Sequence, residues 1–258
     1  MKKILLLFLL LFISNLTFGQ EKNPAFKDGE WLRYKLEYNN FLRAGTATLS
    51  VEKTTLKNKK VFHVTGKGWT SGMIKWFFKV DDDYQSYFDV KTLKPYLFKR
   101  KINEGGYIKN QNTSFNYEIK KAYIQDFKNQ TDSLVVIDDV QDVISMLYFL
   151  RNKDITMLKI NEEIETTMFI DSESTPFKLR FLGTEIINTK FGKVKTMRFR
   201  PFVQSGRIFK ERESVTIWVT ADENKIPIKI AAVLSVGTLR AELEAYKGLA
   251  NPFEIIYD

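Results

Sequence analysis

Apolar and polar residues alternate with a period of two along several stretches of the chain. In WLRYKLEY, residues 31–38, one set of alternate side chains is mostly charged and the other set is apolar or aromatic. This period is typical of a strand with one face on a core and the other in water. The segments VTIWV (215–219) and IPIKIAAVL (226–234) are rich in β-branched residues, which pleated sheets favour. The pattern predicts a mainly β protein built from antiparallel strands.

Landmarks of the first half return in the second half at a nearly constant distance. DVKTLKPYLFKRKINEGG (89–106) and ADENKIPIKIAAVLSVGT (221–238) both run from an Asp through a polar turn to a Pro, and then on to a Gly. Pairs of corresponding residues lie 132 to 134 positions apart: Asp89 and Asp222, Pro95 and Pro227, Gly105 and Gly237, Val61 and Val194, Leu49 and Leu182, Gly72 and Gly206. We infer an internal duplication over about 26–125 and 158–248, each copy a meander of about six strands.

One convincing helix is predicted between the two copies, over residues 139–151. Apolar side chains follow helical spacing along it, at Val140, Val143, Ile144, Met146, Leu147, Phe149 and Leu150. A helix that is apolar over so much of its circumference is buried. Asp139 is suited to the N-cap position, with Asp142 three residues further on in a capping-box-like relation. The predicted fold is two curved, half-barrel-like antiparallel sheets wrapped around this central helix, in a single β-rich domain over residues 20–258.

The first nineteen residues have the pattern of a secretory signal peptide. Lys2 and Lys3 precede an apolar run over residues 4–13, and Thr17-Phe18-Gly19 places small residues at the cleavage positions. The alternative, a membrane anchor, is disfavoured because the run is shorter than the roughly 20 residues that span a bilayer. We expect cleavage after Gly19 and export to the periplasm, with an extracellular location left open.

Composition narrows the classes of partner that we expect for the exported chain. From residue 20 onward there are 239 residues with 38 basic and 31 acidic side chains, and there is no cysteine in the sequence. The positive charge is scattered and accompanies no nucleic-acid motif, so we expect no nucleic-acid partner. The basic residues fit solvated strand faces and turns. The alternative is attraction to an anionic surface such as membrane phosphates or acidic glycans.

Residue patterns of catalysis are missing from the sequence. Cysteine is absent, and the one histidine, His63, lies inside a predicted strand, where packing or hydrogen bonding explains it. Neither a G-x-S-x-G elbow nor a phosphate-binding glycine loop occurs. The triplet Asp81-Asp82-Asp83 lacks the spacing of a calcium loop and suits a solvated turn. We therefore expect no enzymatic activity, metal or cofactor, although two carboxylates acting together on a glycan remain an alternative.

An aromatic cluster is the most distinctive local feature. The segment GWTSGMIKWFFKV, residues 68–80, concentrates large apolar side chains, and its counterpart in the second copy is more polar. One interpretation is core packing. The other is that some of these side chains bind an apolar or sugar ligand, with aromatic residues of the second copy opposite. The candidate ligand-binding residues are Trp69, Trp76, Phe78, Phe202 and Phe209.

Four segments resemble a known family. They are RAGTATLSV (43–51), TSGMIKWFFKVDDDYQSYFDVKTLKPYLF (70–98), DVISMLYFLR (142–151) and IWVTADENKIPIKI (217–230). They are similar to the domain-of-unknown-function 3108 family of exported bacterial proteins, over roughly residues 26–248. The architecture is more loosely similar to the half-barrel carriers that move lipoproteins across the periplasm, which is an analogy of fold.

The resemblance implies location and fold and no specific activity. Together with the missing catalytic patterns it favours a non-enzymatic periplasmic protein that binds a lipid, another amphiphile or a cell-envelope glycan. The alternatives are an envelope scaffold that works through protein contacts and a carboxylate-based glycan-active enzyme.

Overall fold

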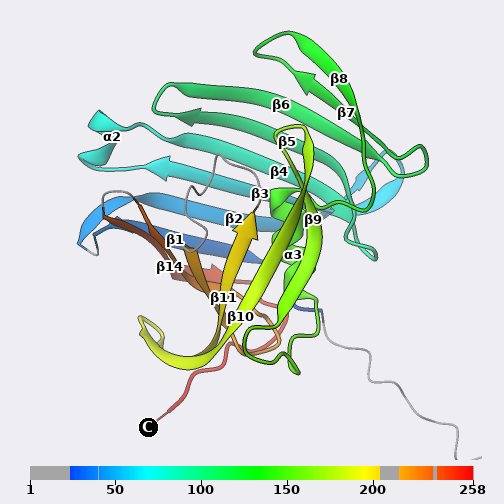
Figure 1. Ribbon diagram of the computed structural model, residues 1–258. Coiled ribbons are helices and arrows are strands. Elements are labelled where there is room, and N and C mark those ends of the chain that lie inside the picture. The colour runs from blue at the N-terminus through cyan, green and yellow to red at the C-terminus, as the bar shows by residue number, and fades with distance from the viewer. Residues whose placement is uncertain (1–23, 40, 204–214, 235–236, 258) are drawn as a thin grey trace, which may run out of the picture.

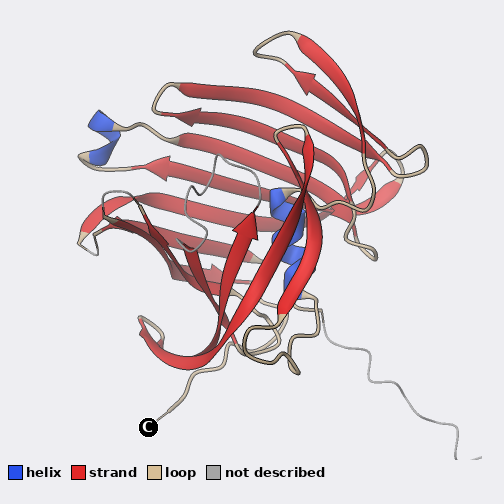
Figure 2. Ribbon diagram, in the orientation of Figure 1, coloured by secondary structure: helices blue, strands red, loops and turns tan. Residues whose placement is uncertain are grey.

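The computed structural model describes residues 24–39, 41–203, 215–234 and 237–257. Within these residues the strands form one continuous antiparallel sheet of fourteen strands, in the order β8-β7-β6-β5-β4-β3-β2-β1-β14-β13-β12-β11-β10-β9. The sheet is strongly curved, and helix α3 lies inside the curve (Figures 1 and 2). No helix in the described ranges is long and apolar enough to cross a membrane. The expected signal peptide lies outside the described residues.

Strands follow one another directly along most of the described chain. The first eight strands are β1 (Trp31–Tyr38), β2 (Leu42–Leu56), β3 (Lys59–Thr70), β4 (Asp81–Asp89), β5 (Pro95–Glu104), β6 (Tyr107–Asn116), β7 (Lys121–Asp126) and β8 (Thr131–Val136). The others are β9 (Glu163–Ile170), β10 (Glu173–Thr189), β11 (Gly192–Val203), β12 (Val215–Thr220), β13 (Pro227–Val233) and β14 (Thr238–Lys247). The helices within the described ranges are α2 (Ile74–Phe77) and α3 (Val143–Arg151).

Strand β1 joins the two halves into one sheet, which corrects the expected pair of sheets. It pairs on one side with β2, where Trp31 lies opposite Ser50, and on the other with β14, where Trp31 lies opposite Lys247. A strand at the edge of each copy would leave a row of backbone N–H and C=O groups without partners. Pairing the edge of one copy with the edge of the other satisfies both rows.

Strand positions in the two halves correspond closely. Strand β9 lies 132 residues after β1 at both bounds, and β11 lies 133 residues after β3 at both bounds. Strands β5 and β13 begin at Pro95 and Pro227, where the missing N–H disturbs the ladder least. The duplication itself stays a prediction, and these positions agree with it.

Helix α3 begins later than the sequence suggested. Its N-cap is Asp142, whose Oδ1 accepts hydrogen bonds from the backbone N–H groups of Ile144 and Ser145, each at 2.8 Å. Ser145 Oγ accepts in return from the Asp142 N–H at 2.9 Å, which closes a capping box. Asp139, the predicted N-cap, is instead exposed and forms an ion pair with Lys94 at 2.5 Å. Burial raises the pKa of the Asp142 carboxyl to about 6, although Ser86 donates to it at 2.6 Å.

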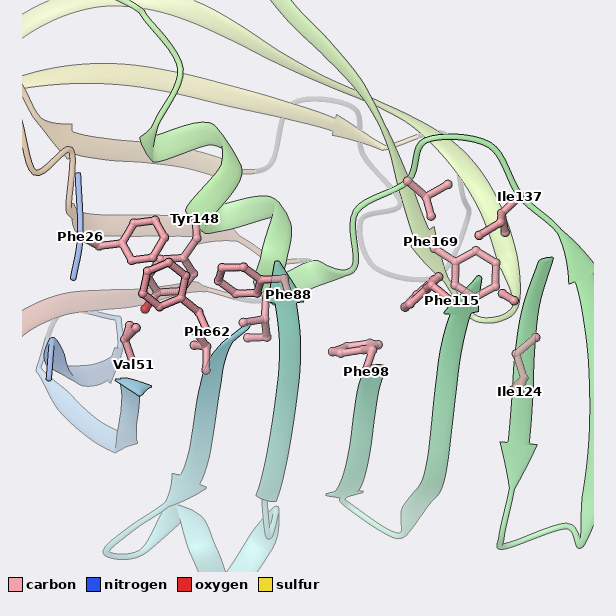
Figure 3. Packing of buried hydrophobic residues seen from close by; sticks show 14 of the residues in the cluster. Phe26, Val51, Phe62, Phe88, Phe98, Phe115, Ile124, Ile137, Tyr148 and Phe169 are labelled. Carbon is pink, nitrogen blue, oxygen red and sulfur yellow. The ribbon is translucent and has the colours of Figure 1, made fainter. Parts of the chain in front are cut away.

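The core divides into three clusters, and α3 contributes to two of them. Ile144 and Tyr148 belong to a cluster with residues of β2 to β7, whereas Met146 belongs to one formed mainly with β9, β10 and β11. Figure 3 shows the rings of Phe26, Phe62 and Phe88 gathered around Tyr148. The ring centroids of Phe26 and Tyr148 lie 4.6 Å apart in an edge-on arrangement. The helix thus connects strands of the first half with strands of the second.

Candidate functional site

An apolar cavity of about 380 Å³ lies between α3 and the curved sheet. Both halves of the chain line it. Its apolar side chains come from β2, α3 and the segment that follows it, and β9 to β14: Ala47, Leu49, Leu147, Leu150, Ile155, Ile164, Phe177, Leu179, Phe199, Ile217, Val219, Pro227, Ile230 and Ala241. A space of this size and lining is typical of small-molecule sites, which measure roughly 300–1,000 Å³.

Two glycines of β3 help to keep this space open. Gly66 and Gly68 lie two residues apart on one face of the strand, and both line the cavity. A Cβ atom at Gly68 would meet no atom within 4 Å, whereas one at Gly66 would approach Ile144 and Leu49 at 3.1 and 3.2 Å. Strand interiors seldom keep glycine without a reason such as close approach or room for a ligand. Open space therefore lies next to Gly68.

One end of the cavity is polar. Arg151, the last residue of α3, lines the cavity and makes a buried two-pronged ion pair with Glu30, at 2.6 and 2.8 Å. Its other donors reach the backbone oxygens of Ala25 and Asn224, both at 2.9 Å. Arg151 thus ends the helix beside a carboxylate, and its charge also suits the helix dipole there.

Tyr34 lies in the same polar region. Its ring lines the cavity, and its buried hydroxyl has no hydrogen-bond partner among the described residues. Burial raises the pKa of this hydroxyl far above its usual value, and the nearby Arg151 opposes the shift only in part. Tyr34 is thus a neutral donor at ordinary pH. A buried polar group of this kind is costly when it stays without a partner.

A pair of carboxyl groups lies at another side of the site. Asp82 of β4 is buried, lines the cavity and accepts a hydrogen bond from the Asn103 N–H at 3.0 Å. Burial first, and then its hydrogen bond and charge interaction with Asp82, raise the pKa of Glu104 to about 7. Asp81 to Asp83 begin β4 and do not form the solvated turn that we expected. The two acids lie on neighbouring strands, so they are not opposed across the cavity.

The structure places the predicted ligand-binding residues away from this cavity. Trp69 is the penultimate residue of β3 and is exposed, and Trp76 and Phe78 lie in and beside the exposed helix α2. Phe202 lies in β11, with the Arg180 guanidinium 4.5 Å from its ring centre. Phe209 lies outside the described residues. None of the four described residues lines the cavity, and their role in ligand binding stays a prediction.

Core packing does not explain the aromatic segment either, because α2 buries none of its residues. His63 behaves as expected for a strand residue. Its ring stacks on Tyr87 with centroids 4.1 Å apart, and it hydrogen-bonds to Gln85 at 3.2 Å.

Sequence reasoning missed the residues that do line the cavity, Tyr34 and Gly68 among them. The available signal was the pair of glycines two residues apart in GKG, residues 66–68, inside a segment with strand composition. The apolar lining residues give no such signal, because they cannot be distinguished by type from residues of a filled core.

A single open, curved antiparallel sheet with an apolar interior defines a β-barrel-like class of protein. Within that class, the chain belongs to the family described as "Protein of unknown function (DUF3108)", which it matches over residues 33–244. This confirms the resemblance noted in the sequence. No curated protein matches the chain.

Solved structures similar to this chain include the following two. One is a β-barrel-like protein of the domain of unknown function DUF1849 from Brucella abortus, with 12% sequence identity and a TM-score of 0.54, covering 85% of this chain and 97% of that one. The other, from Bacteroides fragilis, is described as exported and as having a YmcC-like fold, with 9% identity and a TM-score of 0.35, covering 86% and 97% of the two chains. The first likeness supports the β-barrel-like fold alone.

Proposed function

We propose that this protein is a non-enzymatic binding protein that holds an apolar or amphiphilic molecule in the cavity between α3 and the sheet. The observation that carries the proposal is the cavity itself, apolar along β9 to β14 and polar near Tyr34 and Arg151. Apolar walls with a few convergent polar groups are the usual composition of a ligand site.

The polar end favours an amphiphile over a plain hydrocarbon. The Tyr34 hydroxyl is a buried donor without a partner in the described chain. The surrounding atoms cover this hydroxyl, so a ligand oxygen that moved a neighbouring side chain aside would satisfy the donor and recover part of the cost of burying it. Arg151 is already committed to Glu30 and to two backbone oxygens, so it holds the walls of the site in place. A fatty acyl compound with an oxygen-bearing head group has the required chemistry.

The cellular setting of the proposal is the periplasm. Its support is the apolar run after Lys2 and Lys3, which has the length and flanks of a cleavable export signal. In this setting a cavity protein would keep an envelope lipid or a similar amphiphile out of water. N-terminal sequencing of the protein recovered from a periplasmic extract tests both parts, because cleavage after Gly19 leaves Gln20 as the first residue.

Filling the cavity is the direct test of binding. A Gly68→Leu side chain would occupy the space beside β3, whereas Gly68→Ala makes nearly the same backbone change with little added volume. We expect Gly68→Leu to weaken binding of the fluorescent apolar probe N-phenylnaphthylamine about tenfold or more, since about 1.4 kcal/mol of lost contact suffices. Gly68→Ala should bind nearly as the unaltered protein does. Equal binding by the two variants would contradict the proposal.

The Tyr34→Phe variant tests the polar end separately. It removes a hydroxyl that has no partner among the described residues, so the thermal stability should not fall. Binding of the uncharged probe should persist. Affinity for a long-chain fatty acid should drop by several-fold, consistent with one lost hydrogen bond of about 0.5–1.5 kcal/mol. Mass spectrometry of molecules extracted from the natively purified protein would then identify the natural ligand.

A further inference from the structure

Exposed apolar side chains gather at one end of the sheet, in the connection between β3 and β4. We call residues 71–80 the tip. Its short helix α2 buries no residue, and Trp76 and Phe77 are 88% and 86% exposed. Met73 and Phe78 are exposed as well. Figure 1 shows α2 projecting from the end of this hairpin. Folded proteins rarely expose a contiguous group of large apolar side chains unless it contacts something.

The backbone holds the tip in place on both sides. The Ser71 N–H donates to the Ala44 oxygen of β2 at 3.0 Å, and the Gly105 N–H of the β5–β6 turn donates to the Lys79 oxygen at 2.8 Å. The ring of Phe78 lies against Gly105, where any larger residue would collide with it. Phe41, in the neighbouring β1–β2 connection, is 79% exposed. The tip and Phe41 thus present their apolar side chains at the same end of the sheet, and hydrogen bonds on both sides hold the tip.

The charges of the tip are positive. Lys75 and Lys79 are exposed, neither forms an ion pair within the described ranges, and the tip contains no acidic residue. Three acidic residues follow the tip. Asp82 is buried and Asp83 forms an ion pair with Lys67 at 3.6 Å, so Asp81 is the one of the three that is neither buried nor in an ion pair within the described ranges. Aromatic side chains flanked by lysines are the composition that places a segment at the boundary between lipid head groups and acyl chains.

We propose that the tip docks this protein on a lipid bilayer that carries anionic head groups. Trp76 and Phe77 enter the interface, and the ammonium groups of Lys75 and Lys79 contact lipid phosphates. A convex, aromatic tip suits a deformable surface, which needs no matching pocket. The charge complementarity favours anionic lipid over a second copy of this chain, whose scattered charge is also positive overall. This surface is separate from the cavity, so the inference does not depend on the proposed ligand.

The test is co-sedimentation with lipid vesicles. It uses the protein in the form that its host produces, with the N-terminus determined by mass spectrometry. One set of vesicles contains phosphatidylglycerol mixed with phosphatidylcholine, and the other contains phosphatidylcholine alone. We expect binding to the mixed vesicles. The double variant Trp76→Ser/Phe77→Ser should lose at least about tenfold in affinity, because two aromatic side chains no longer leave water. Lys75→Glu/Lys79→Glu should abolish the preference for phosphatidylglycerol.

The matched control is Ile119→Ser/Val136→Ser, which removes two exposed apolar side chains near the β6–β7 turn and the end of β8. It should bind vesicles as the unaltered protein does. Retained binding by the Trp76→Ser/Phe77→Ser variant, or equal losses in it and in the control, would overturn the proposal. A dimer that depends on the tip, in a protein that binds neither kind of vesicle, would also overturn it and would assign the tip to self-association.

Discussion

The two faces of α3 contrast in how they are packed. On one face, Tyr148 is fully buried in a close set of rings that includes Phe26, Phe62 and Phe88. On the other face, Leu147 and Leu150 are only partly buried and line an empty space of about 380 Å³. Protein interiors are normally filled to crystal-like density, so a void beside a well-packed core needs its own explanation. The contrast separates a closely packed side of the helix from a side that borders the cavity, which is where we propose that a ligand binds.

Breaking the ion pair at the end of the helix should have the largest effect on this arrangement. Glu30 and Arg151 are 1% and 2% exposed. Glu30→Ala would leave the Arg151 guanidinium buried without its carboxylate, and we expect a loss of about 3–5 kcal/mol in the free energy of unfolding. Denaturant unfolding measures it. The double variant Glu30→Ala/Arg151→Met should recover part of that stability, because it removes the uncompensated charge. A double variant no more stable than Glu30→Ala would show that the charge is not the cause.

Alanine substitutions on the two faces compare them directly. Tyr148→Ala removes a buried ring and should cost about 3–5 kcal/mol in the free energy of unfolding. Leu147→Ala should cost only about 1–2 kcal/mol, because this side chain is half buried and already borders a cavity. Tyr148→Phe is the control for the ring, and it should not destabilise the protein, since the Tyr148 hydroxyl has no partner in the described structure. Equal losses for Tyr148→Ala and Leu147→Ala in denaturant unfolding would remove the contrast.

The smallest expected effect is on the pH dependence of the melting temperature, and it comes from the carboxyl pair Asp82 and Glu104 beside the cavity. The pKa of Glu104 is raised in the folded protein, from an ordinary 4.5 to about 7. The folded state therefore holds a proton that the unfolded chain has released, so the favourable contribution is complete below pH 4.5 and is lost as the pH rises through about 7. We expect the melting temperature to fall over this window. Glu104→Gln should flatten that fall.

Other acids set the background of this titration measurement. Asp142, whose pKa is raised to about 6, contributes a fall in the same direction that Glu104→Gln leaves intact. The acids whose pKa values are lowered, such as Asp89 and Asp171, titrate below this window. Melting curves measured between about pH 5 and pH 8 separate the effects. A slope unchanged by Glu104→Gln would exclude Glu104 as its source.

The local elements of this fold were predictable, whereas their long-range pairing was not. The prolines that begin β5 and β13 and the strand alternation in β1 are local signals, and the structure agrees with them. The pairing of β1 with β14 joins residues about 210 positions apart, and no local pattern indicates which edges will meet. The predicted N-cap was wrong because two aspartates, Asp139 and Asp142, both precede apolar residues, and only burial beside Ser86 distinguishes them.

The candidate site was harder to predict than the fold. The prediction selected Trp69, Trp76 and Phe78 because they are large aromatic residues. It was made without knowing that they face water, which a sequence does not reveal. The cavity depends on residues that are small, such as Gly68, and on a tyrosine whose sequence context resembles any core-facing strand position. A cavity forms where segments that are distant in the sequence do not fill the space between them, so no local sequence pattern indicates it.

The open sheet also bears on self-association by strand addition. In the part of the chain that the structure describes, the fourteen-stranded sheet does not close and leaves two outer edges, at β8 and β9, where another chain could add a strand. The edge of β9 is partly covered by the backbone of Gln141. Its backbone N–H donates to the backbone oxygen of Thr167 at 2.9 Å, and its backbone oxygen accepts from the N–H of Phe169 at 2.8 Å. Strand β8 is only six residues long and carries Asp132. Short or covered edges are among the means by which β proteins avoid fibril growth, so both edges of this open sheet are poor templates for an added strand.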